Sequence, residues 1–123
     1  VDDQPGAREL VRRVLEDRGA RVTTAASADE ALRLLGGERP HVVLCDIGMP
    51  GKDGYEFIRE ARRLGHVTPA VAVTAFARAE DRLRALRAGY QGHVVKPVEP
   101  AELVATVAVF AGQSFGGNEP DAS

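Results

Sequence analysis

The sequence predicts an α/β fold in which helices cover both faces of a parallel sheet. Short apolar runs of strand length alternate along the chain with longer segments whose apolar residues recur at helical spacing. The runs at 41–45 and 69–73 are almost entirely apolar, which is typical of strands buried on both faces of a parallel sheet. Regular alternation of such strands with helices favours this class over all-α or all-β folds.

The first half of the chain contains clear signals for where each element begins and ends. Pro5 favours the first turn of a helix and Gly19 its end. Ser27 and Glu30 have the spacing of a capping box at the start of a second helix. The expected elements, in order, are a helix at 7–18, a strand at 20–25, a helix at 28–35, a strand at 41–45 and a loop at 47–54.

The second half repeats the same alternation. Gly65 is expected to end a helix, and Pro100 fits the first turn of another. The expected elements are a helix at 57–64, a strand at 69–73, a helix at 83–88, a strand at 93–95 and a final helix from residue 100. We expect one domain at 1–112, followed by a flexible tail or linker at 113–123 that is rich in Gly, Ser, Asn and Asp.

The composition excludes several classes of protein. With 44% hydrophobic residues in 123, the chain can bury a core, and Cys45 is the only cysteine, which rules out an internal disulfide. A formal net charge of −2 argues against nucleic acid as a direct partner. No apolar run approaches the roughly 20 residues of a membrane span, so we expect a cytoplasmic protein with no membrane partner.

Polar residues follow the ends of the expected strands. They are Asp2, Asp3, Asp46, Thr74 and Lys96. The carboxyl ends of parallel strands lie at one edge of a sheet, so these side chains should converge there. Three carboxylates in one cleft repel each other unless a cation neutralises them. Oxygen ligands of this kind favour Mg²⁺, with Mn²⁺ as the alternative.

The same group of residues suits a phosphoryl group. The ammonium of Lys96 and the hydroxyl of Thr74 could each contact a phosphoryl oxygen, together with the metal ion. Asp46 would then be the nucleophile that forms an acyl phosphate. A carboxylate is already ionised near neutral pH, so it needs no general base.

Four sequence blocks resemble the signature of response-regulator receiver domains, including the chemotaxis type. They are Val-Asp-Asp at 1–3, Cys-Asp-Ile-Gly-Met-Pro-Gly-Lys-Asp-Gly at 45–54, Val-Thr-Ala at 73–75 and Val-Lys-Pro at 95–97. The resemblance implies a flavodoxin-like, doubly wound sheet of five parallel strands in the order 2-1-3-4-5. On this comparison Val1 is the end of a truncated first strand, so we expect either further residues before it in the natural protein or a neighbouring chain that fills the gap.

The resemblance also implies roles for individual residues. Asp46 would accept a phosphoryl group from a histidine kinase or a phosphotransfer protein. Asp3 would bind Mg²⁺ directly and Asp2 through water, with Asp46 and the backbone carbonyl of Gly48 as further ligands. The position of Gly48 also separates this chain from aspartyl-phosphate hydrolases, which usually carry a second aspartate there.

Further positions would act in switching. Lys96 would pair with a phosphoryl oxygen, and the Thr74 hydroxyl would move toward the phosphate. His93 stands where many receivers have the Tyr or Phe that turns inward on activation. The Lys96–Pro97 peptide bond is expected to be cis. Phe76 lies beside the path of a hydrolytic water, which predicts slow loss of the phosphoryl group.

The sequence thus favours a phosphorylation-controlled switch of a two-component phosphorelay, not an enzyme. Its expected partners are a kinase or phosphotransfer protein, a downstream protein or output domain, and a second copy in a homodimer. Two alternatives stay open: a docking or dimerisation module that acts without phosphorylation, and a phosphohydrolase. Arginines 78, 82, 84 and 87 are more typical of a solvated helix face than of a contact surface, yet they form the best candidate contact region.

Overall fold

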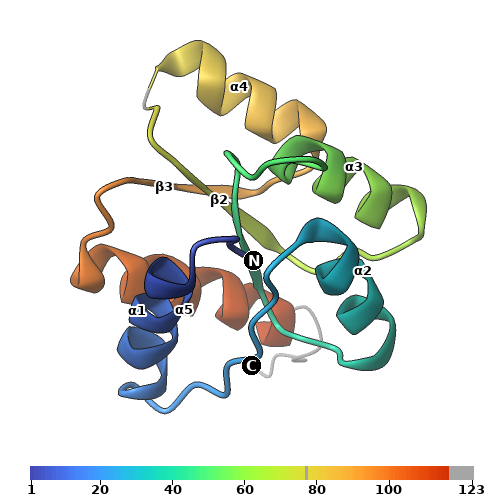
Figure 1. Cartoon of the computed structure of the whole chain (residues 1–123). Coiled ribbons are helices and arrows are strands. Elements are labelled where there is room, and N and C mark those ends of the chain that lie inside the picture. Colours follow the sequence, from blue (N-terminus) through green and yellow to red (C-terminus); the bar gives the residue numbers. More distant parts are fainter. Residues whose placement is uncertain (77, 117–123) are drawn as a thin grey trace.

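The computed structural model describes residues 1–76 and 78–116 and contains a parallel sheet between two layers of helices (Figure 1). Its strands, in the order β1-β2-β3, are β1 (Val43–Asp46), β2 (Ala70–Thr74) and β3 (Gly92–Val95). The helices are α1 (Pro5–Glu16), α2 (Ala28–Gly37), α3 (Gly54–Arg63), α4 (Ala79–Ala88) and α5 (Pro100–Gly116). Helices α1 and α5 pack together on one side, and α2, α3 and α4 form a row on the other.

Strand β2 is the centre of the sheet, and all five of its residues are buried. Its side chains alternate between the two faces. Ala70 and Ala72 belong to the core under α2, α3 and α4, whereas Val71 and Val73 belong to a second core with Phe110 of α5. Phe110 reaches the sheet over Gly92, where an added Cβ would lie 2.5 Å from its ring. The three strands match those expected at 41–45, 69–73 and 93–95.

The backbone of residues 1 and 2 lies between Ala25 and strand β1. The nitrogen of Val1 donates to the Leu44 carbonyl (2.6 Å), and the Asp46 amide donates to the Val1 carbonyl (2.9 Å). On the other side, the Asp2 amide donates to the Ala25 carbonyl at 3.0 Å. This is the place that the order 2-1-3-4-5 gives to the first strand.

The expected strand at 20–25 is wrong for this structure, since those residues are irregular. A ladder needs repeated backbone hydrogen bonds to a neighbour. Among the described residues, a single such bond, from Asp2 to Ala25, joins this segment to the backbone beside it. The β-branched residues at 22–24 favour a strand, but the backbone of residues 1 and 2 beside them does not supply the repeated hydrogen bonds that a strand needs.

Two helix starts are fixed by side chains. At α2, the Ser27 hydroxyl accepts from the Glu30 amide (3.2 Å), but the Glu30 carboxylate accepts from the Ala26 amide instead of the Ser27 amide. A complete capping box stands at α3, where Asp53 and Glu56 each accept from the other's backbone amide at 2.9 and 3.0 Å. This box starts α3 immediately after the loop that follows β1.

The last helix is longer than expected. It continues to Gly116, four residues beyond the expected domain end at 112. The rest of the expected tail, 117–123, lies outside the described residues. None of the helices in the described part of the chain has the length and apolar character needed to cross a bilayer.

Candidate functional site

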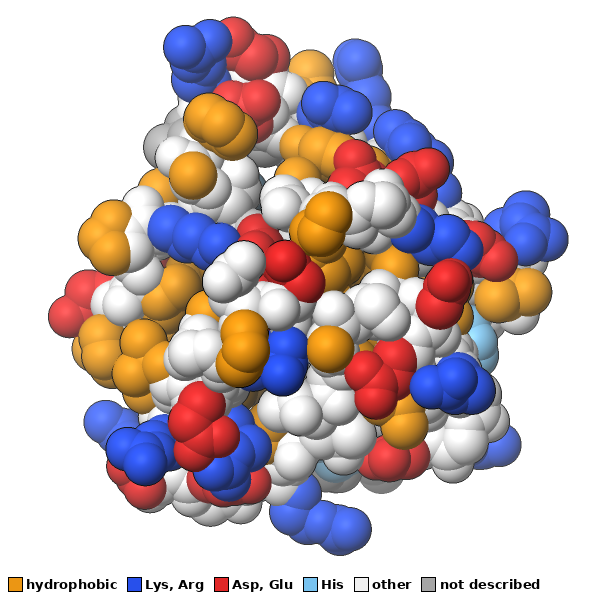
Figure 2. Space-filling view, viewed as in Figure 1, with side chains coloured by type: hydrophobic (Ala, Val, Ile, Leu, Met, Phe, Trp, Pro, Cys, Tyr) orange, Lys and Arg blue, Asp and Glu red, His pale blue; other side chains and the backbone are white. Residues whose placement is uncertain are grey.

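The predicted site residues are placed by the ends of the three strands. Asp46 ends β1, Thr74 ends β2, and Lys96 directly follows β3. Asp2 and Asp3 precede α1 and directly follow Val1, whose backbone bonds β1. In Figure 2, acidic side chains gather near the middle of the face, where Figure 1 places the N-terminus.

The carboxylates converge as the sequence predicts. Asp2, Asp3 and Asp46 each offer an oxygen, and these oxygens lie within 4.8 Å of one another. The Lys96 ammonium lies 3.0 Å from Oδ2 of Asp46. Oδ1 of Asp46 accepts from the Gly48 amide at 3.1 Å. Asp46 is thus a buried carboxylate, 5% exposed, with one oxygen on a cation and the other on the loop that follows it.

The three carboxylates outnumber the cations that contact them. Burial raises the pKa of Asp2, and the Asp46 charge raises it further, against a hydrogen bond from the Gln4 amide at 2.9 Å that lowers it. Lys96 is the one basic side chain in ion-pair contact with the group within the part of the chain that the structure describes. Negative charge is therefore left over at this edge of the sheet, and a cation would stabilise it.

A magnesium ion fits these donors. All of them are carboxylate oxygens, which hard divalent cations prefer, and Asp2 and Asp3 are half-buried, so water could complete an octahedral shell. Gly48 lies next to the group because its amide bonds Asp46. A ligand role for the Gly48 carbonyl stays a prediction.

The two switch candidates, Thr74 and His93, make no hydrogen bond to Asp46 among the described residues. The Thr74 hydroxyl, on a buried residue, accepts from the Phe76 amide at 3.0 Å, and no hydrogen bond among the described residues joins it to Asp46. His93 on β3 has a buried Nε2 with no partner in the described structure. Its pKa lies below the ordinary value because burial disfavours the imidazolium and Arg82 repels it. The Lys96–Pro97 peptide bond is cis, as expected.

Two supporting interactions were missed by sequence reasoning. The buried hydroxyl of Tyr90 donates to the Gly54 carbonyl at 2.7 Å. At Gly54, an added Cβ would lie 2.9 Å from the Asp46 carbonyl oxygen, so only glycine lets α3 approach the end of β1 this closely. The glycine was visible in the sequence, but a tyrosine 36 residues away gave no signal of its contact.

Lys52 was also missed. Its ammonium lies 2.9 Å from carboxylates of Asp29 and Glu60, and so links the loop after β1 to helices α2 and α3. Met49, Pro50 and Lys52 of this loop form one wall of a shallow cavity of about 280 Å³, and Asp3 also lines it. Of the three carboxylates, Asp3 is the one that lines this cavity.

Cys45 is fully buried next to Asp46, and burial raises the pKa of its thiol to about 11. The thiol is therefore neutral and shielded near pH 7, as an inert core residue should be.

Comparison with known proteins gives a consistent result. Residues 1–108 match the family model of the response regulator receiver domain. An uncharacterized 14.6 kDa protein of Leptolyngbya boryana is 50% identical over 109 residues, which cover 87% of this chain and 83% of that protein. Response regulator Rre1 of Synechocystis is 40% identical over 110 residues, and sensor histidine kinase RcsC of Salmonella typhi is 39% identical over 111.

The last two relatives are longer proteins. The matched region covers 87% of this chain but 48% of Rre1, and 90% of this chain but 12% of RcsC. The chain therefore corresponds to one region of each.

Solved structures agree with the sequence relatives. The receiver domain of the Francisella response regulator 1452 superposes with a TM-score of 0.87 at 25% identity, covering 92% of this chain and 93% of that one. Chemotaxis protein CheY4 of Vibrio cholerae gives a TM-score of 0.84 at 32% identity, covering 89% and 92%. With the family match over residues 1–108, these likenesses show that the chain belongs to the response regulator receiver domain family of two-component signalling.

Proposed function

We propose that Asp46 is the phosphoacceptor of this receiver domain. The observation that carries the proposal is one buried carboxylate with the Lys96 ammonium at 3.0 Å and two further carboxylates within 4.8 Å. This arrangement orients Asp46, and it provides charges of both signs around a phosphoryl group.

In the transfer step, an Asp46 carboxylate oxygen attacks the phosphorus of a phosphohistidine on the partner. A new O–P bond forms as the P–N bond breaks, and the imidazole nitrogen keeps the electron pair and takes a proton from solvent. Lys96 then moves from the carboxylate oxygen to a phosphoryl oxygen, whose negative charge it neutralises. Hydrolysis later returns Asp46 as a carboxylate and releases inorganic phosphate.

The family typically binds Mg²⁺, and we assign its ligands here to Asp2, Asp3, Asp46 and the Gly48 carbonyl, with Mn²⁺ as a substitute. When bound, the ion neutralises charge on the phosphoryl oxygens during transfer. The role of Asp2 and Asp3 is to hold this charge beside Asp46 before the donor arrives. Their partial exposure leaves the approach to Asp46 open.

Phosphorylation is proposed to act on Thr74 and His93. A phosphoryl group on Asp46 offers the Thr74 hydroxyl a charged acceptor, so Thr74 gives up its bond from the Phe76 amide and turns toward the site. The unpartnered Nε2 of His93 makes its present packing easy to exchange for another. The phosphate thus shifts the population between two arrangements of the loop after β2 and of β3.

The phosphoryl donor is proposed to be a histidine kinase or a phosphotransfer protein. The output is a downstream protein, an attached output domain, or a homodimer. Relatives of this chain include a response regulator and a sensor histidine kinase, both longer than the matched region.

Intact-protein mass spectrometry after treatment with acetyl phosphate and Mg²⁺ tests the proposal. We expect a mass gain of one HPO₃ group that disappears in Asp46→Asn and persists in Asp29→Asn, a matched change at an exposed carboxylate. No gain in the wild type, or a gain that survives Asp46→Asn, would favour a docking module that works without phosphorylation.

A further inference from the structure

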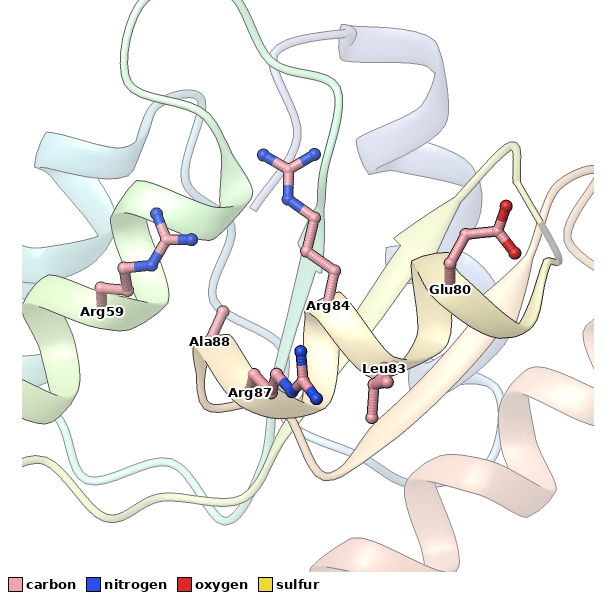
Figure 3. Close-up of a pocket in the computed structure, with 6 residues that line it drawn as sticks. All are labelled: Arg59, Glu80, Leu83, Arg84, Arg87 and Ala88. Atoms are coloured by element: carbon pink, nitrogen blue, oxygen red, sulfur yellow. The ribbon is translucent and has the colours of Figure 1, made fainter.

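A shallow groove between α3 and α4 contains an unusual concentration of arginine. It has a volume of about 290 Å³, and Figure 3 shows Arg59 on α3 and Arg84 and Arg87 on α4 around it. Leu83, Ala88 and Glu80 complete the lining. None of these residues belongs to the Asp46 site, and the groove lies on the side of α4 that faces α3.

A single aromatic ring organises two of the guanidinium groups. Tyr55, at the start of α3, is buried, with 7% of its surface exposed. The guanidinium carbon of Arg84 lies 4.0 Å from the centre of this ring, and that of Arg59 lies 6.0 Å from it. Cation–π attraction to a fixed ring holds both side chains near the groove and lowers the entropy lost when they bind an anion.

The arginines of the groove have no carboxylate partner in the described part of the chain. No ion pair there involves Arg59, Arg84 or Arg87, and the nearest carboxylate of the lining, Glu80, pairs weakly with Arg78 at 3.8 Å. Three guanidinium groups therefore face one carboxylate in a chain whose formal net charge is −2. Their mutual repulsion would be relieved by an anionic partner.

The groove also has an apolar component. Leu83 is 45% exposed although it lies on a helix, and the buried Ala88 adds a small apolar wall. In Figure 2 basic, acidic and apolar side chains are interspersed over the region of α3 and α4. Arginines around an exposed apolar side chain are typical of a protein-binding surface, and the shallow form suits another helix better than an enclosed small ligand.

We propose that this groove binds an acidic amphipathic helix of a protein partner. Carboxylates of that helix would pair with Arg59 on one side and with Arg84 and Arg87 on the other, while an apolar residue between them would cover Leu83. In helix-in-groove recognition, side chains three or four residues apart on one face of the bound helix contact the groove in this way. Nucleic acid fits less well, because the rest of the chain is net negative and would repel a phosphate backbone.

The test uses the full chain and two synthetic helical peptides of about 15 residues, roughly four turns. One has glutamates at i and i+4 on either side of a leucine, and the other has glutamine in place of glutamate. Binding is followed by fluorescence anisotropy and by NMR signals of the arginine side chains. We expect only the acidic peptide to bind, with shifts at Arg59, Arg84 and Arg87 and with weaker binding at higher salt.

Charge-reversal variants give the matched comparison. Arg59→Glu and Arg87→Glu should each weaken binding about tenfold, which corresponds to about 1.4 kcal/mol. Arg33→Glu, at an exposed arginine of α2, makes the same change in net charge away from the groove and should leave affinity nearly unchanged. Thermal unfolding of each variant checks that both groove variants remain folded.

Several results would overturn the proposal. They are equal binding of the two peptides, no binding of either, equal losses in Arg33→Glu and Arg87→Glu, or tighter binding of single-stranded DNA than of the acidic peptide through the same arginines. Asp46→Asn should bind the peptide as the wild type does. Failure of peptide binding would therefore leave the assignment of Asp46 unaffected, and the reverse also holds.

Discussion

Replacement of Lys96 by methionine should destabilise the folded chain in the absence of divalent cations. Lys96 contacts one of the three carboxylates, with its ammonium 3.0 Å from Asp46. Methionine keeps much of the length and apolar stem of lysine but removes the charge. Among the described residues, the variant leaves Asp46 buried beside two like charges with no basic side chain in ion-pair contact.

The size of the effect follows from the exposure of the two partners. At 3.0 Å and an effective dielectric constant of about 20, the attraction between Lys96 and Asp46 is about 5.5 kcal/mol before any cost of desolvation. Loss of one partner from a fully buried pair costs about 3–5 kcal/mol, whereas an exposed pair contributes about 0–1. The Asp46 side chain is 6% exposed and that of Lys96 35%, so we expect a loss of about 2 kcal/mol.

Urea unfolding at pH 7 with a chelator present measures the loss, and Lys52→Met provides the control. Lys52 is about as exposed as Lys96, but one of its partners, Asp29, is 79% exposed. Its replacement should therefore cost clearly less than that of Lys96. Equal losses in the two variants, or a Lys96→Met chain as stable as the wild type, would refute the claim that Lys96 holds an otherwise uncompensated charge cluster.

Three further variants test separate parts of the account. Burial raises the pKa of Asp2 in the folded chain. The protonated carboxyl therefore stabilises the folded state at pH values below the ordinary carboxyl pKa. This stabilisation is lost as the pH rises through the raised pKa. Asp2→Asn should therefore stabilise the metal-free chain at pH 7 in urea titrations, and a gain that grew toward about pH 4 would contradict this sign. Gly54→Ala should cost about 1–3 kcal/mol by calorimetry, because its Cβ would lie 2.9 Å from the Asp46 carbonyl oxygen, whereas Gly36→Ala has open space and should be neutral or stabilising. Phe76 is 62% exposed and lies two residues after Thr74. If its ring hinders the hydrolytic water, as the sequence predicts, Phe76→Gln should release phosphate about tenfold faster after labelling. A wild type that loses its label faster than this variant would reject that role.

Much of the fold and the site could be predicted because both follow from local patterns. Helical periodicity and the buried strands at 41–45 and 69–73 located most elements, and the rule that parallel strands end at one edge brought Asp46, Lys96 and the N-terminal aspartates together. These inferences require only the sequence order of the elements and their polarity.

What could not be predicted depends on contacts between distant side chains. The bond from Tyr90 to the Gly54 carbonyl and the ion pairs of Lys52 join residues that share no local pattern. The strand at 20–25 had a suitable composition, but a strand needs a neighbour along its length, and composition does not report this. The gathering of Arg59 and Arg84 on one ring depends on how α3 and α4 pack.

The assignment of Asp46 is tested most directly by locating the phosphoryl group itself. After labelling with acetyl phosphate and Mg²⁺, borohydride reduction converts an aspartyl phosphate to homoserine, and peptide mass spectrometry identifies its position. The account predicts homoserine at position 46 and at none of the other aspartates. Homoserine at Asp2, Asp3 or Asp53, or none in a chain that carries the label, would contradict it.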